Sequence, residues 1–247
     1  MRLARIPAAK KNGHRAISAV ARWSGRHQVP VAVLPTAKSL SAFSLKPQSD
    51  RLLEDAFEQA EKPVADFLRT LLEFMSDDLP AMIHGRIAPE GFDPWREAFR
   101  IIQAYETWQS FGDFVTEHQP KTGPGIRERM AFAATVTKAQ ADASRLVHDK
   151  AREHIRQIAA PGTILALPTA PAIAPLADTP AADLEDFRKR VMRLTCTAGM
   201  AGLPQMSIPA GTINGCPVGL SFIGWAGGDE ALLDLACKLA PHCGMAA

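Results

Sequence analysis

The chain has no apolar run that is long enough to cross a membrane. A spanning helix needs about 20 consecutive apolar residues, and the apolar stretches of this sequence are far shorter. No hydrophobic segment typical of a secretion signal follows Met1. We therefore expect a cytoplasmic protein without a membrane partner.

Cysteine is scarce, and its spacing argues against a metal or disulfide framework. Cys-x-x-Cys pairs are the usual sign of zinc and redox centres, and disulfide frameworks belong mainly to secreted proteins. No such pair occurs among the four cysteines, which are Cys196, Cys216, Cys237 and Cys243. We expect reduced thiols, no metal and no other cofactor.

Acidic residues are absent from the first 30 positions, which carry seven basic residues. Subtracting these seven from the 28 basic residues of the chain leaves 21, against 26 acidic residues. A mildly acidic remainder offers no broad basic surface for nucleic acid. We interpret residues 1–28 as a disordered or non-native basic segment, with a transit peptide or a phosphate-binding arm as alternatives. Residues 29–247 form the remaining region.

Apolar periodicity predicts five helical segments. The first runs from about Ser49 to Met75, and Pro63 kinks it or begins a second helix. Asp93 as a cap and the proline after it open another, which continues to Val115. The remaining three are expected at about 126–158, from Thr179 or Asp183 to Leu194, and from Gly228-Asp229 to Leu239.

Short apolar runs predict the strands of a sheet. The run VPVAVLP from Val29 has prolines near both ends, as an edge strand does. Ile164–Leu167 is nearly continuous and apolar, which is typical of a strand covered on both faces. Asn214-Gly215 between Met206–Pro209 and Val218–Ile223 predicts a hairpin. Strands interspersed with helices favour an α/β protein with a mixed sheet layered by helices.

Several motifs resemble the C-terminal part of the amidase signature enzymes. They are LPTAPAIAP, FRKRVMRLTCTAGMAGLPQMSIPAGTINGCPVGLSFIG and DEALLDLA, and the stretch AFRIIQAYETWQSFGDFVTEHQPKTGPGIRERM is similar to bacterial amidases. The resemblance covers about Val29 to Leu239. It implies the mixed α/β sheet of amidases and hydrolysis of a carboxamide C–N bond through an acyl-serine intermediate. Amidotransferase A subunits and allophanate hydrolases are relatives.

That chemistry needs a nucleophilic serine, a base and backbone N–H groups aimed at the oxyanion. In the family these come from an N-terminal Lys and a stretch of the form GGSSGGS. This sequence has no such stretch, and none of its eleven serines adjoins another. Ser207 lacks the flanking glycines of a nucleophile elbow, so we interpret it as structural. We assign no catalytic residue.

The resemblance implies that this half of the family lines the substrate pocket. Loops that leave the ends of sheet strands are common binding sites, although these residues also suit ordinary turns. The substrate-binding residues we expect nearest the acyl group are Thr169, Pro171, Gly202, Pro204 and Gln205.

Three hypotheses of function follow. The chain is the C-terminal part of an amidase-family hydrolase, inactive alone and binding a small amide substrate only with the missing N-terminal half. Alternatively, it is a non-catalytic subunit or pseudoenzyme that binds a partner protein, or an active hydrolase with unrecognised residues. Apolar residues around Arg193 favour a stand-alone amidase with a neutral or apolar substrate. Open strand edges would cause poor solubility and self-association.

Overall fold

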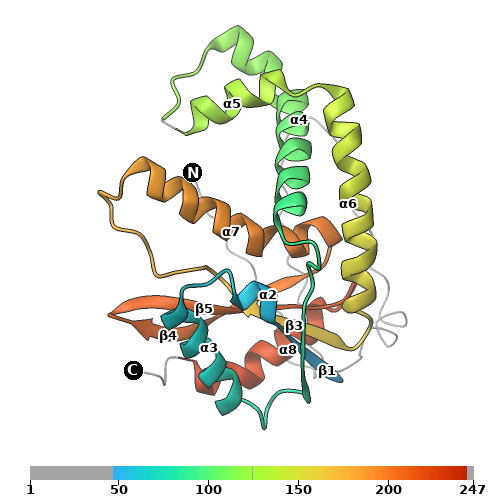
Figure 1. Ribbon diagram of the computed structural model, residues 1–247, viewed down its shortest axis with the longest axis vertical. Helices are drawn as coiled ribbons and strands as arrows, with labels where there is room; N and C mark the ends of the chain where they lie inside the picture. Colours follow the sequence, from blue (N-terminus) through green and yellow to red (C-terminus); the bar gives the residue numbers. More distant parts are fainter. Residues whose placement is uncertain (1–46, 124, 244–247) are drawn as a thin grey trace, which may run out of the picture. The chain divides into compact units, whose positions relative to one another are not determined.

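One mixed sheet organises the part of the chain that the computed structural model describes, residues 47–123 and 125–243. Its strands lie in the order β2-β1-β3-β5-β4 (Figure 1). β1 pairs in parallel with β2 and β3, whereas β5 is antiparallel to β3 and β4. The strands are β1 (Ser49–Leu53), β2 (Met82–Gly85), β3 (Thr163–Pro168), β4 (Gln205–Ile213) and β5 (Cys216–Ile223).

Helices cover both faces of this sheet, which confirms the predicted α/β class (Figure 1). Apolar residues of α3 and α8 share a core with one face, while those of α6 and α7 share a second core with the other. The helices are α2 (Glu54–Phe57), α3 (Lys62–Phe74), α4 (Asp93–His118), α5 (Ile126–Thr135), α6 (Lys138–Ile158), α7 (Ala181–Ala201), α8 (Asp229–Leu239) and the short 3₁₀ helix η1 (Ala240–His242).

The central strand β3 is buried on both faces, as its apolar run predicts. Ile164 and Ala166 belong to the core under α3 and α8, whereas Leu165 and Leu167 belong to the core under α6 and α7. Alternation of side chains along a strand produces this division. All four residues are fully buried, so β3 anchors both layers.

The predicted hairpin is confirmed. Asn214 and Gly215 have φ values of 51° and 75°, which are the two positive values that a tight two-residue hairpin turn requires. β4 pairs with β5 from Ile213↔Cys216 to Gln205↔Ile223, with one irregularity between Pro209 and Gly211. The turn thereby fixes the register of the edge strand β4.

The helix predicted from about Ser49 is wrong over its first residues, which form β1 instead. A short apolar run satisfies both the helical and the strand pattern, and here pairing with β2 and β3 decides the outcome. Pro63 lies in the first turn of α3, where its missing N–H leaves no helical hydrogen bond unmade. The break at Pro63 is therefore confirmed.

The single helix predicted for about 126–158 is two helices. Val136 is extended, and Thr137 caps α6 in a reciprocal capping box with Gln140. The Thr137 hydroxyl accepts from the Gln140 backbone N–H at 3.3 Å, while the Gln140 side chain accepts from the Thr137 N–H at 2.9 Å. These paired bonds favour a new helix start over continuation.

One further expectation, the cap at Asp93, is wrong, and another, the strand from Val29, is not tested. Asp93 is not a cap, because Phe92 occupies that position and Asp93 lies in the first turn of α4. Strand β2 was not predicted. The strand expected from Val29 lies outside the described residues.

Within the described ranges, every helix is too short or too polar to span a bilayer.

Candidate functional site

Three hydroxyl groups meet on the face of the sheet that α7 covers in part. Thr169 directly follows β3, Ser207 lies in β4, and Ser221 lies opposite Ser207 in β5. The Thr169 Oγ1 lies 2.5 Å from the Ser207 Oγ and 2.8 Å from the Ser221 Oγ, and the two serine oxygens are 3.2 Å apart. We call these three residues the hydroxyl cluster.

The hydroxyl cluster connects the interior of the protein to its surface. Ser221 is fully buried, Thr169 is half-buried and Ser207 is exposed. Glycine is required beside them, because a Cβ on Gly219 would lie 2.8 Å from the Thr169 Oγ1. The Thr169 N–H also donates to the Gly219 carbonyl at 3.1 Å. Backbone and side chain thus hold Thr169 against β5.

Pro171 has a different position and fixes the loop that follows β3. Its carbonyl accepts a 2.7 Å hydrogen bond from the backbone N–H of Glu61, the residue before α3. Pro171 is buried, so its side chain packs within the protein. Its contact with Glu61 restrains the segment that presents Thr169.

Gly202 ends α7 in a left-handed conformation with φ of 60°, as a helix C-terminus commonly requires. The Leu203 N–H donates to the Ala198 carbonyl at 3.1 Å. Pro204 then accepts from the Gly224 N–H at 3.0 Å, where β5 ends. The turn therefore delivers the chain from α7 into β4 at a fixed point.

The expected substrate-binding residues form two groups along the sheet. Gln205 pairs with Ile223, which pairs with Leu165 on β3. Thr169 lies four residues further along β3, or roughly 13 Å at the usual rise of a strand. Gln205 and Ser207 are exposed on one face of β4, so they join the two groups into one polar strip.

The chemistry of this strip is that of neutral hydrogen bonding. Hydroxyl and amide groups both donate and accept, which suits a neutral polar ligand such as a carboxamide. Among the described residues, no hydrogen bond joins the hydroxyl cluster to a lysine, histidine or carboxylate side chain. A serine nucleophile needs such a base, and none is hydrogen-bonded to the cluster among the described residues.

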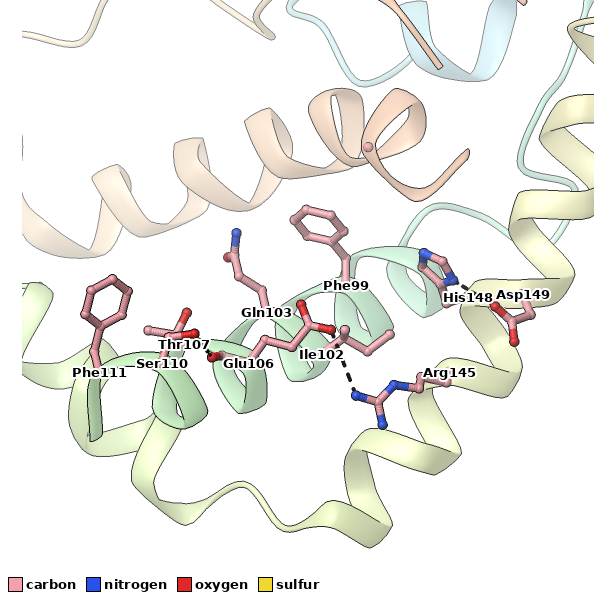
Figure 2. Close-up of a pocket in the computed structure, with 11 residues that line it drawn as sticks. Phe99, Ile102, Gln103, Glu106, Thr107, Ser110, Phe111, Arg145, His148 and Asp149 are labelled. Atoms are coloured by element: carbon pink, nitrogen blue, oxygen red, sulfur yellow. Dashed lines mark hydrogen bonds and ion pairs between the residues drawn. The ribbon is translucent and has the colours of Figure 1, made fainter. Parts of the chain in front are cut away.

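A cavity of about 590 Å³ lies between α4, α6 and α7. Seven of its lining residues come from α4, three from α6, and Gly199 comes from α7. Figure 2 shows Phe99, Gln103 and Phe111 projecting from α4 toward the α7 ribbon. None of the expected substrate-binding residues lines it. The sequence does contain a pattern that could indicate this cavity wall, because positions 99, 103, 107 and 111 recur every four residues and so lie on one face of α4.

One cysteine of α7, Cys196, is buried in the core under α6 and α7. Burial raises the pKa of Cys196 to about 12, and a thiol rather than a thiolate is a poor nucleophile. In the described part of the chain, no three His, Cys, Asp or Glu side chains gather as metal ligands do.

Comparison with known proteins identifies relatives for this fold and this sequence. Amidase 1 of Arabidopsis thaliana is 32% identical over 143 residues, covering 58% of this chain and 34% of the relative. Outer envelope protein 64, chloroplastic, of the same plant is 28% identical over 142 residues, covering 58% and 24%. A crystal structure of an amidase superposes with a TM-score of 0.71 at 21% identity, covering 81% of this chain and 46% of that one.

These matches define how much of a relative the chain represents. The chain spans about a quarter to two fifths of the length of the curated relatives just named and of Amidase 1 from Oryza sativa subsp. japonica. The family model for amidases matches residues 102–233, which is more than half of the 247 residues and includes α7, the hydroxyl cluster and every lining residue of the cavity except Phe99. The chain belongs to the amidase family.

Proposed function

We propose that the chain forms the substrate-binding wall of a carboxamide hydrolase and does not itself carry the nucleophile. The observation that supports this most strongly is the hydroxyl cluster, which offers ligand-binding groups without a base among the described side chains. In the complete enzyme, hydrolysis proceeds through an acyl-serine, and this chain contributes the C-terminal part. By itself it is inactive.

In this proposal the polar strip holds the amide group of a small neutral substrate. The Thr169 and Ser207 hydroxyls hydrogen-bond the amide, and the buried Ser221 keeps the Thr169 hydroxyl in place. Gln205 lies on the same face of the sheet and contacts the remainder of the substrate. None of these four side chains is charged, so the strip offers no ionic partner to a charged acyl group.

The cytoplasm is the compartment that we propose for this reaction. All four cysteines are free. Free thiols are the rule in reducing compartments, whereas secreted proteins commonly pair theirs.

A chimeric enzyme tests the binding role. Residues 47–243 would replace the matching part of a complete amidase, and the chimera would be assayed on simple amides. We expect Thr169→Val and Gln205→Ala each to lower kcat/KM about tenfold, as loss of one hydrogen bond to a substrate does. Thr212→Val is the matched control, because Thr212 is exposed on β4 near the hairpin turn. Unchanged kcat and KM in both variants would remove these residues from the site.

A second function, that of a non-catalytic subunit, has its own supporting observation. Five large apolar side chains are exposed on α4, α5 and α6, as a partner-binding surface would require; they are Phe111, Phe114, Ile126, Leu146 and Val147. A chimera that folds but is inactive, together with a discrete oligomer of the purified chain in size-exclusion chromatography, would favour this function. The apolar side chains also support self-association of the isolated chain.

A further inference from the structure

The cavity between α4, α6 and α7 has an apolar wall and a polar wall. Phe99, Ile102 and Phe111 supply the apolar side chains. Gly199 of α7 faces the Phe99 ring, which a Cβ at that position would contact at 3.4 Å. With about 590 Å³ of space, the cavity falls within the usual range for small-molecule sites.

The polar wall has two carboxylates and one guanidinium, an excess of one negative charge. Glu106 projects from α4 and Asp149 from α6 (Figure 2). Arg145 is the only Lys or Arg that lines the cavity in the described part of the chain, and carboxylates already engage it. Its Nη1 donates to Asp142 at 2.8 Å, its Nη2 lies 3.9 Å from Glu106, and its guanidinium stands over the Tyr105 ring. An incoming carboxylate would meet these acids as like charges.

Neutral polar groups complete the wall. Gln103 and Thr107 lie one turn apart on α4, and neither side chain hydrogen-bonds another residue in the described ranges. Both can accept an N–H from a ligand. His148 contributes an imidazole whose Nδ1 lies 3.1 Å from Asp149.

We infer that this cavity binds an amphipathic amine, with an aromatic or alkyl body against Phe99 and Ile102 and a protonated amino group facing Glu106 and Asp149. The inference stands apart from the proposed hydrolysis, because it concerns binding by this chain alone. An aromatic ring of the ligand packs favourably against the Phe99 ring, and the ammonium group is desolvated only in part, so moderate affinity is expected.

Two probes with the same body and opposite charge test this site on the purified chain. 2-Phenylethylamine and 3-phenylpropionate both place a charged group two carbons from a phenyl ring. We expect the amine to bind with a Kd of about 1 mM or tighter and at least about tenfold more tightly than the acid, a difference in keeping with close like-charge contacts. Backbone chemical shifts should change in α4, α6 and α7. Equal binding of both probes, or no amine binding, would overturn the inference.

Substitutions locate the binding. Glu106→Gln and Asp149→Asn should each weaken amine binding roughly two- to fivefold, the range for exposed charges. Gln103→Trp should abolish it, because Gln103 is an exposed lining residue one turn from Phe99, where an indole would occupy the place of the ligand's body. Far-UV circular dichroism checks that each variant folds.

Glu117→Gln is the matched control. Glu117 lies on the same helix and is exposed, but it does not line the cavity. If Glu117→Gln weakened binding as much as Glu106→Gln, the attraction would belong to the general surface charge. If Gln103→Trp folded and still bound the amine unchanged, the cavity would not be the site. Either result would overturn the inference.

Discussion

The two faces of the β4–β5 hairpin differ although alternate residues of the same two strands build them. Toward α3 and α8, the hairpin presents only apolar side chains, which are Ile208, Ala210, Val218, Leu220 and Phe222. Toward α7, Ile223 is buried but Gln205, Ser207 and Ser221 follow as a polar strip. Strand alternation therefore places a buried apolar surface on one face and a row of polar side chains on the other.

Removing a large side chain from the hairpin face toward α3 and α8 should have the largest effect on stability. Phe222 is fully buried in the core under α3 and α8, so Phe222→Ala should lower the free energy of unfolding by about 3–5 kcal/mol. Phe111 is 54% exposed, and Phe111→Ala is the matched control with an effect within about 0.5 kcal/mol. Urea denaturation measures both. Similar losses of unfolding free energy in the two variants would contradict the difference between the buried face of the hairpin and the exposed surface.

One buried carboxyl group, that of Asp50, lies against the apolar core under α3 and α8. Asp50 lies two residues before Leu52 on the same face of β1 and pairs with Ile164, and both of these neighbours belong to the core under α3 and α8. It is fully buried, and neither carboxyl oxygen has a hydrogen-bond partner among the described residues. Burial raises the pKa of Asp50 from 3.8 to about 7.

The sign of its pH effect follows from that shift. The folded protein holds this proton more tightly than the unfolded chain, so the contribution of Asp50 to stability is greatest below pH 4 and declines as the pH rises to about 7. Asp50→Asn should remove that decline. The stability of the variant relative to the parent chain should therefore be roughly 2–4 kcal/mol more favourable at pH 8 than at pH 4. Thermal or urea unfolding at both pH values measures it. An identical pH dependence in the variant would contradict the assignment.

The contact between α7 and the start of α4 should contribute less. Arg193 donates from Nε and Nη2 to the two carboxylate oxygens of Asp93, both at 2.9 Å, and from Nη1 to Gln59 at 3.2 Å. Lysine cannot reproduce this fork, so Arg193→Lys should cost about 1 kcal/mol. Arg188→Lys, on the same helix with a 3.8 Å ion pair to Glu185, should cost almost nothing. Equal costs would show that the fork adds no stability.

The sequence predicts elements well where local chemistry decides them. Asn214-Gly215 specify their turn by conformational preference alone, and Pro63 marks the start of α3. At Ser49–Leu53 local chemistry points the wrong way, because Ser49 resembles a cap and apolar residues follow at helical spacing. Pairing with β2 and β3, which are distant in the chain, determines that segment.

The residues of the candidate site also differ in whether the sequence alone could indicate them. Thr169 and Gln205 could be chosen from the family resemblance, and their role in binding remains a prediction. Ser221 gave no signal as a partner of Thr169, which lies 52 residues earlier, because their contact depends on the register of β3 against β5. The cavity was also missed, since it arises from the way three helices pack.

Amidase activity of the purified chain tests the central claim most directly. The claim is that this fold binds an amide but lacks the nucleophile that cleaves it. Ammonia release from acetamide and benzamide would be measured on protein whose near-UV circular dichroism shows fixed tertiary packing. The account predicts no release above that of a buffer blank. Turnover that Ser207→Ala abolishes in a protein that still folds would contradict it.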